Sequence, residues 1–153
     1  SSRLFTEVRE RRGLAYYVRA EHGAYHDTGS FSVRCGVAQG KIEEALKTIT
    51  HELKKISNKR VPASELGRAK EFLHGKITLD LEDSAEVAEW YGRQAMLTGR
   101  ILTPHEKLAK LDKVTAAEIQ TVARAIFQRP KFRLAVIGPY DNAKPFLKIL
   151  SSF

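Results

Sequence analysis

Residues 1–18 read SSRLFTEVRERRGLAYYV, and they predict a helix that runs directly into a β-strand. The apolar residues Leu4, Phe5 and Val8 recur at the spacing of one helix face, with charged residues between them. Gly13 follows, and a glycine can adopt the positive φ that ends a helix. The stretch therefore predicts a basic amphipathic helix that ends at Gly13.

The residues after this glycine, 14–18, are aromatic, β-branched or small and apolar, and they predict a strand. An arginine late in the helix and a tyrosine early in the strand can then point toward one spot; these are Arg9 and Tyr16. An arginine can hold a peptide carbonyl or carboxylate through its forked donors, and a tyrosine hydroxyl can donate to a developing oxyanion. A plainer alternative is a surface ion pair for Arg9 and an ordinary strand aromatic at Tyr16. Residue types and spacing alone favour that alternative.

The chain has the length and composition of one domain. Its 153 residues are 42% apolar, which is enough for a single core of ordinary size. No stretch approaches the roughly 18 apolar residues of a membrane span, and residues 1–12 contain no apolar signal core, so we expect a soluble chain. Cys35 is the only cysteine, which excludes an intrachain disulfide, and the surrounding FSVRCGV predicts a buried thiol in a strand. A single cysteine does not indicate the cellular compartment of the protein.

The charge balance raises nucleic acid as a partner, but the charge distribution argues against it. Lys and Arg number 26 and Asp and Glu 18, a net charge of +8. The basic residues are mostly interleaved with acids, as on solvated helix faces, and the only dense cluster is Arg9, Arg11 and Arg12. The aromatic residues are not spaced for base stacking. We therefore expect no nucleic-acid partner and no membrane span.

The rest of the chain predicts two strands, a helical middle and a third strand. The strand-like runs 15–21 and 30–38 flank HGAYHDTG, whose glycines suit a hairpin loop, so they predict an antiparallel pair. Apolar periodicity and capping residues predict the helices. These cover residues 41–56, 61–83, 84–97, 103–111, 115–126 and 143–150, and the third strand covers residues 132–137.

Strands at both ends and helices between them imply an α+β fold, with the helices packed on one face of a small, mainly antiparallel β-sheet. Three strands make a thin sheet for this many helices. Because long unpaired edges are usually covered, we expect either a chain that begins within a domain or a sheet completed by another polypeptide, which leaves homo-oligomerisation open.

The chain does not contain a complete known catalytic apparatus. None of its five histidines lies in a His-Glu-x-x-His motif or in the inverted His-x-x-Glu-His motif. His22 and His26 are four residues apart, but the glycine between them predicts a loop, which favours surface histidines over a metal site. There is no Gly-x-Ser-x-Gly elbow and no phosphate-binding loop, and nothing near Cys35 would lower its pKa. We expect no metal ligands in this chain and no activity from it alone.

The opening segment, SRLF-x-E-V-R-E-R-R-G-L-A-Y, resembles a segment of the insulinase/pitrilysin family of zinc peptidases, which includes mitochondrial processing peptidase. The resemblance extends over nearly the whole chain through short matches in a consistent order. These are the pattern D-x-G-x-F at Asp27, Gly29 and Phe31, and the stretches Ser64–Lys70, Glu82–Ala88, Val114–Ile119 and Ala135–Pro139. The chain is most similar to the C-terminal, second half of such proteins, and we interpret residues 1–153 as that domain or an incomplete copy of it.

The resemblance implies two homologous α+β halves that enclose a chamber and have different roles. The first half holds zinc and the glutamate that activates water, and the second supplies an arginine and a tyrosine. On this mapping Arg9 binds substrate and Tyr16 stabilises the transition state, while Gly13 and Leu14 set their geometry. Strand alternation puts Tyr16 and Tyr17 on opposite faces, so we expect only one of them to face the chamber.

Two functions remain open, beside a weaker third, a basic helix that binds nucleic acid or an acidic partner. The first is the substrate-binding part of a zinc-dependent endopeptidase that hydrolyses peptides or presequences, with the zinc supplied by another domain or subunit. The alternative is a non-catalytic structural homologue that acts as an assembly subunit, as the core subunits of the respiratory cytochrome complex do. Retention of both Arg9 and Tyr16 favours the first. The sequence does not identify the substrate.

Overall fold

The computed structural model describes residues 2–152 and has an α+β fold, as the sequence predicts. Ser1, where the expected helix begins, lies outside the described residues. The chain divides into two compact units. We call Ser1–Lys59 with Gln120–Phe153 the hairpin unit, and Arg60–Ile119 the helical unit.

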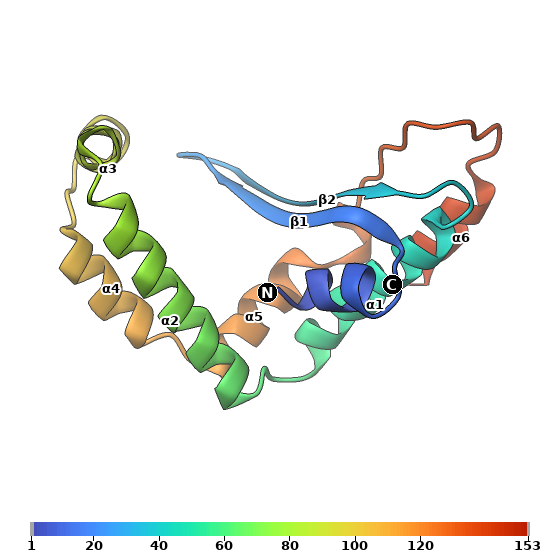
Figure 1. The fold of residues 1–153 in the computed structure, drawn as a ribbon, viewed down its shortest axis with the longest axis horizontal. Coiled ribbons are helices and arrows are strands. Elements are labelled where there is room, and N and C mark those ends of the chain that lie inside the picture. Colours follow the sequence, from blue (N-terminus) through green and yellow to red (C-terminus); the bar gives the residue numbers. More distant parts are fainter. Residues whose placement is uncertain (1, 153) are drawn as a thin grey trace. The chain divides into compact units, whose positions relative to one another are not determined.

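The hairpin unit is built on one antiparallel pair of strands, β1 (Ala15–Ala24) and β2 (Gly29–Val37) (Figure 1). The pair confirms the expected hairpin, but β1 is longer than expected. His22 and Gly23 belong to the strand because they pair with Phe31 and Ser30. The loop therefore shrinks to residues 25–28, where the Tyr25 N–H donates to the Thr28 carbonyl at 2.9 Å.

The helices of this unit lie along one side of the hairpin (Figure 1). They are the short helix η1 (Phe5–Glu10), α1 (Ile42–Asn58), the end of α5 (Ala116–Ile126) and α6 (Lys144–Ser151), with a 3-10 turn, η2 (Arg129–Lys131). Apolar side chains from η1, β1 and α1 form the core: Leu4, Val8, Leu14, Ala15, Val18, Ala45, Ile49 and Leu53. The expected packing of helices on one sheet face is thus present in the hairpin unit.

The prediction of a third strand is wrong. Residues 132–137 form no strand in the structure, and the sheet of the described residues has only β1 and β2. The alternating apolar residues of this segment favour an extended backbone, but a strand also needs a neighbour with free backbone donors and acceptors. Ile137 remains fully exposed and Leu134 is 41% exposed, as expected for a segment that pairs with no strand among residues 2–152.

The helical unit contains α2 (Ala63–Asp80), α3 (Ser84–Leu97) and α4 (Pro104–Asp112), close to the expected ranges. Polar contacts join α2 to α4. His74 Nε2 lies 2.8 Å from Asp112 Oδ1, and the Lys70 ammonium donates to the Asp112 carbonyl at 2.6 Å. None of the residues in these three helices is buried.

No helix within residues 2–152 has the length and apolar content needed to cross a membrane.

Capping boxes fix the starts of α4 and α5. Thr103 and Glu106 form one, and Thr115 and Glu118 form the other, which the sequence predicts. In each box the threonine N–H and hydroxyl both donate to the glutamate carboxylate at 2.8 Å. These bonds favour the charged carboxylate, so they lower the pKa of Glu106 and of Glu118 below the ordinary value of 4.5.

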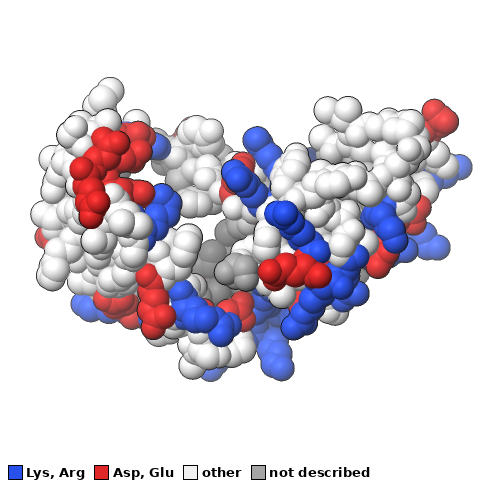
Figure 2. Space-filling view, viewed as in Figure 1, with Lys and Arg blue, Asp and Glu red and all other residues white. Residues whose placement is uncertain are grey.

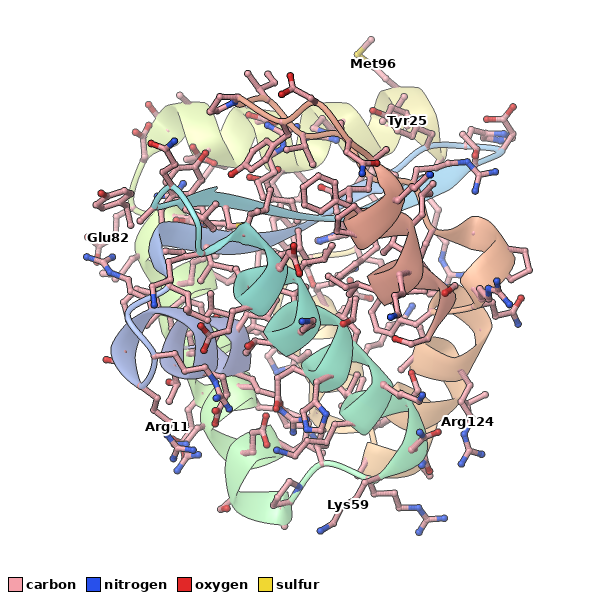
Figure 3. All side chains as sticks on the ribbon, turned by 90° about the vertical axis from the view of Figure 1, so that its right-hand side faces the viewer. Arg11, Tyr25, Lys59, Glu82, Met96 and Arg124 are labelled. Atoms are coloured by element: carbon pink, nitrogen blue, oxygen red, sulfur yellow. The ribbon has the colours of Figure 1, made fainter. Side chains whose placement is uncertain are left out.

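We expect the Glu118→Gln variant to be less stable than the wild type near pH 7 and to lose that difference in acid. A glutamate whose pKa is lowered in the folded state stabilises the fold at pH values above the ordinary glutamate pKa. This stabilisation is lost as the pH falls through the lowered pKa. Urea unfolding followed by far-ultraviolet circular dichroism between pH 7 and pH 3 measures it. Glu82→Gln is the control, because exposed Glu82 caps no helix (Figure 3). A stability gap for Glu118→Gln that grows in acid would contradict the assignment.

Candidate functional site

Helix η1 is a single wide turn that carries Arg9 on its exposed side. The Arg11 N–H donates to the Thr6 carbonyl at 2.9 Å, a five-residue step typical of a π-helix. Such turns are rare and occur frequently at functional sites. Leu4 and Val8 bury the inner side of the turn, with Val8 completely excluded from solvent. The buried side therefore holds Arg9 at the surface of the hairpin unit.

Gly13 turns the chain from η1 into β1, as the sequence predicts. Its φ of 58° lies in the left-handed region, and its N–H donates to the Arg9 carbonyl at 3.0 Å. The next N–H, from Leu14, donates to the Val8 carbonyl at 2.9 Å. The Leu14 side chain is 1% exposed and packs in the core. Hydrogen bonds and burial therefore fix the corner between Arg9 and the start of β1.

Arg9 does not form, with any acid among residues 2–152, the surface ion pair that residue types alone favour. The carboxylate of Glu7 is occupied by Arg11, at 2.7 Å, and by Arg12, at 3.9 Å. Arg11 extends outward from the end of η1 in Figure 3. The guanidinium carbon of Arg9 instead lies 5.0 Å from the centre of the Phe5 ring, a cation–π contact. This contact orients the side chain and, within residues 2–152, leaves its N–H donors free of protein acceptors.

Tyr16 occupies a β-bulge. Ala15 pairs with Val37 and Tyr17 pairs with Gly36, so Tyr16 is an extra residue with no partner on β2. A bulge bends the strand and can re-aim a side chain. The Tyr16 side chain is 72% exposed, and its hydroxyl has no hydrogen-bond partner among the described residues. The phenol is therefore presented to solvent beside the Gly13 corner.

The bulge also overturns the alternation argument for the two tyrosines. Ala15 and Val18 are both buried, whereas Tyr16 and Tyr17 between them are both more than half exposed. The extra residue breaks the two-residue period, so a strict in-and-out assignment does not hold here. Tyr17 lies against its partner Gly36, where an added Cβ would be only 2.6 Å from the Tyr17 ring. Tyr17 is thus packed on its own sheet, and Tyr16 is not.

Arg9 and Tyr16 flank one fixed corner, but their side chains do not hydrogen-bond to each other. Both present polar groups outward, a forked cation and a neutral donor. Such a pair can receive a ligand with a carbonyl or a carboxylate. The sequence predicts these two residues and Gly13 as site residues, and this assignment stays a prediction. The sequence does not predict the bulge or the contact between Tyr17 and Gly36. A glycine within a strand, such as Gly36, nevertheless commonly marks a position where another group approaches the backbone closely.

The described residues do not fit a zinc ion. No group of three or more His, Cys, Asp or Glu side chains among residues 2–152 is arranged to hold a metal. His22 lies in β1 and His26 in the hairpin turn, so the two do not share the expected loop. Burial raises the pKa of the half-buried Cys35 thiol, which keeps it protonated near neutral pH and a poor nucleophile.

Comparisons with known proteins find similarity to peptidases. Residues 1–73 match the family model described as "Peptidase M16 inactive domain". The chain is 36% identical over 143 residues to an uncharacterized zinc protease of Streptomyces coelicolor, covering 93% of this chain and 31% of that protein. It is 31% identical over 142 residues to an uncharacterized zinc protease of Bacillus subtilis, covering 93% of this chain and 34% of that protein. The chain thus spans about a third of the length of these relatives.

A solved structure supports the fold. The crystal structure of a conserved protein from Enterococcus faecalis superposes with a TM-score of 0.69 at 29% sequence identity. The match covers 80% of this chain and 28% of that one.

We expect Gly13→Ala and Gly75→Ala to change stability in opposite directions. Alanine at Gly13 must adopt a positive φ, which costs about 1–2 kcal/mol, although nothing lies within 4 Å of the added Cβ. At exposed Gly75, inside α2, alanine fits the helix and should add up to about 1 kcal/mol. Urea unfolding of the two variants measures both effects. An unchanged midpoint for Gly13→Ala would mean that the corner does not need its left-handed conformation.

Proposed function

We infer that the chain belongs to the C-terminal half of the insulinase-like M16 peptidase family, and from this premise we propose that it is the substrate-binding part of a zinc-dependent endopeptidase. The observation that supports the proposal most is the pair formed by Arg9 and Tyr16 at the Gly13 corner. Both side chains are exposed and neither is taken up by an acid of the described residues.

Arg9 is proposed to hold the peptide substrate. Its guanidinium can donate two parallel N–H bonds to a carboxylate, a geometry that a lysine cannot reproduce, or an N–H bond to a backbone carbonyl. The contact with Phe5 restricts the side chain before substrate arrives, which lowers the conformational entropy lost on binding. A fixed guanidinium can therefore set the register of an extended peptide.

Tyr16 is proposed to stabilise the tetrahedral intermediate of peptide hydrolysis. A neutral phenol donates one hydrogen bond, and that bond strengthens as negative charge develops on the carbonyl oxygen. The Tyr16 side chain is exposed and its hydroxyl has no hydrogen-bond partner among residues 2–152, so none of these residues has to be released first. This arrangement favours the transition state over the bound substrate.

Zinc and the water that it activates would come from another domain or subunit, because the described residues do not fit the metal. The roles of Arg9 and Tyr16 need no ligand from this chain. The alternative function, a structural homologue that serves assembly, is favoured by the name of the matching family, an inactive domain. A metal-free half of an active peptidase would fit the same description, so activity must decide.

The first test is cleavage of a quenched fluorescent peptide by this chain alone and mixed with a zinc-loaded candidate half from the same source. We expect turnover only in the mixture and its loss when a chelator removes the metal. No turnover from a zinc-loaded half that demonstrably binds this chain would favour the structural alternative.

In the active assembly we expect Arg9→Lys and Tyr16→Phe each to lower turnover by roughly tenfold to a thousandfold, the scale of losing one oxyanion donor. Bound zinc should stay unchanged, as metal analysis would verify. Tyr17→Phe is the matched control, because the Tyr17 ring is packed on Gly36 and should keep that contact without its hydroxyl. Wild-type turnover in both Arg9→Lys and Tyr16→Phe would disprove the site.

A further inference from the structure

The helical unit contains a cleft that the proposed peptidase role does not use. It has a volume of about 530 Å³, within the range of ligand-binding pockets, and lies between α3, the connector 98–102 and α4. Hydrogen bonds fix its wall. The Trp90 indole N–H donates to the Leu102 carbonyl at 3.0 Å, and the Gln94 amide accepts from the Leu102 N–H at 2.9 Å. The connector is therefore held against α3 without a ligand.

One part of the cleft is lined by cationic side chains that form no ion pair with the described residues. Arg100, Lys107 and Lys110 line the cavity, and none of them lies within 4 Å of a carboxylate among residues 2–152. Glu106 is the acid near this group, since Arg100 and Lys110 help to lower its pKa. Its carboxylate, however, receives the hydrogen bonds of Thr103. An incoming anion would therefore meet three cationic side chains whose donors are available.

The cleft also contains acids, and these limit what the anion can be. Glu86 and Glu89 line the cavity on α3, and Glu89 pairs with Arg93 at 3.1 Å. Acidic and basic side chains likewise lie interspersed on the face shown in Figure 2. A nucleic-acid backbone carries a charge on every nucleotide and would be repelled by Glu86 and Glu89. A short peptide can match the cleft, with carboxylates at the cations and an apolar side chain at Trp90.

We propose that this cleft is an accessory binding site for acidic peptide segments. Arg100, Lys107 and Lys110 bind the carboxylates, and Trp90 with Leu102 provides the apolar wall for a neighbouring side chain. The site consists only of residues of the helical unit. It does not depend on the proposed roles of Arg9 and Tyr16, so either proposal can fail without the other.

Trp90 provides the measurement, because it is the only tryptophan of the chain. The full chain is titrated with the blocked peptide acetyl-DGLGE-amide, whose two carboxylates flank one apolar residue, while tryptophan emission is recorded, and acetyl-KGLGK-amide and a short oligothymidylate serve as competing ligand classes. We expect a saturable change with the acidic peptide only. The double variant Lys107→Gln, Lys110→Gln should weaken its binding about tenfold or more, because exposed ion pairs contribute modestly but two are removed.

The matched control is Lys144→Gln, Lys148→Gln in α6, which changes the net charge equally within the other unit. It should bind the acidic peptide as the wild type does, and circular dichroism should show both double variants folded. The proposal is overturned by an unchanged Trp90 emission up to about 1 mM acidic peptide, the weak end of specific binding. Equal losses in the two double variants, or tighter binding of the basic peptide or oligothymidylate, would overturn it as well.

Discussion

The corner at Gly13 is the constraint on which the hairpin unit depends. Val8 before it and Leu14 after it are both almost fully buried, so the chain must reverse within a few residues without exposing either. Only the left-handed backbone of Gly13 lets the Leu14 N–H reach the Val8 carbonyl. The same reversal places Arg9 on the last turn of η1 and Tyr16 two residues into β1. Core packing and site geometry thus share one cause.

The features that could be predicted from the sequence are those with local causes. A glycine after an amphipathic turn indicates the corner, and threonine followed by glutamate three residues later indicates the box at Thr115. The bulge at Tyr16 could not be predicted in this way, because it depends on which β2 residue each β1 residue meets. The absent third strand has a similar explanation. Residues 132–137 have strand-like alternation, but pairing requires a neighbour that their own sequence does not specify.

Candidate residues could be identified from the sequence, but not their partners. Arg9 has an acid two positions away, yet Arg11 lies one helical turn from Glu7 and takes its carboxylate at 2.7 Å. Arg9 is left to the ring of Phe5, four residues earlier on the same side of η1. The partner of each arginine therefore depends on competition among neighbouring charges, and residue types alone do not determine it. A guanidinium over an aromatic ring keeps its donors, whereas one paired with an acid would not.

The two units are stabilised by different interactions, and this difference is compatible with the two roles proposed for them. The hairpin unit has a continuous apolar core, whereas α2, α3 and α4 bury no residue and are joined by contacts such as those of Asp112. Segments with few buried apolar contacts open at lower free energy than a packed core. Stabilising a transition state requires groups held within a fraction of an ångström, which favours residues anchored to the core. Binding a flexible peptide tolerates more movement of the protein. The exposed helices can therefore form the proposed peptide contact without the same rigidity.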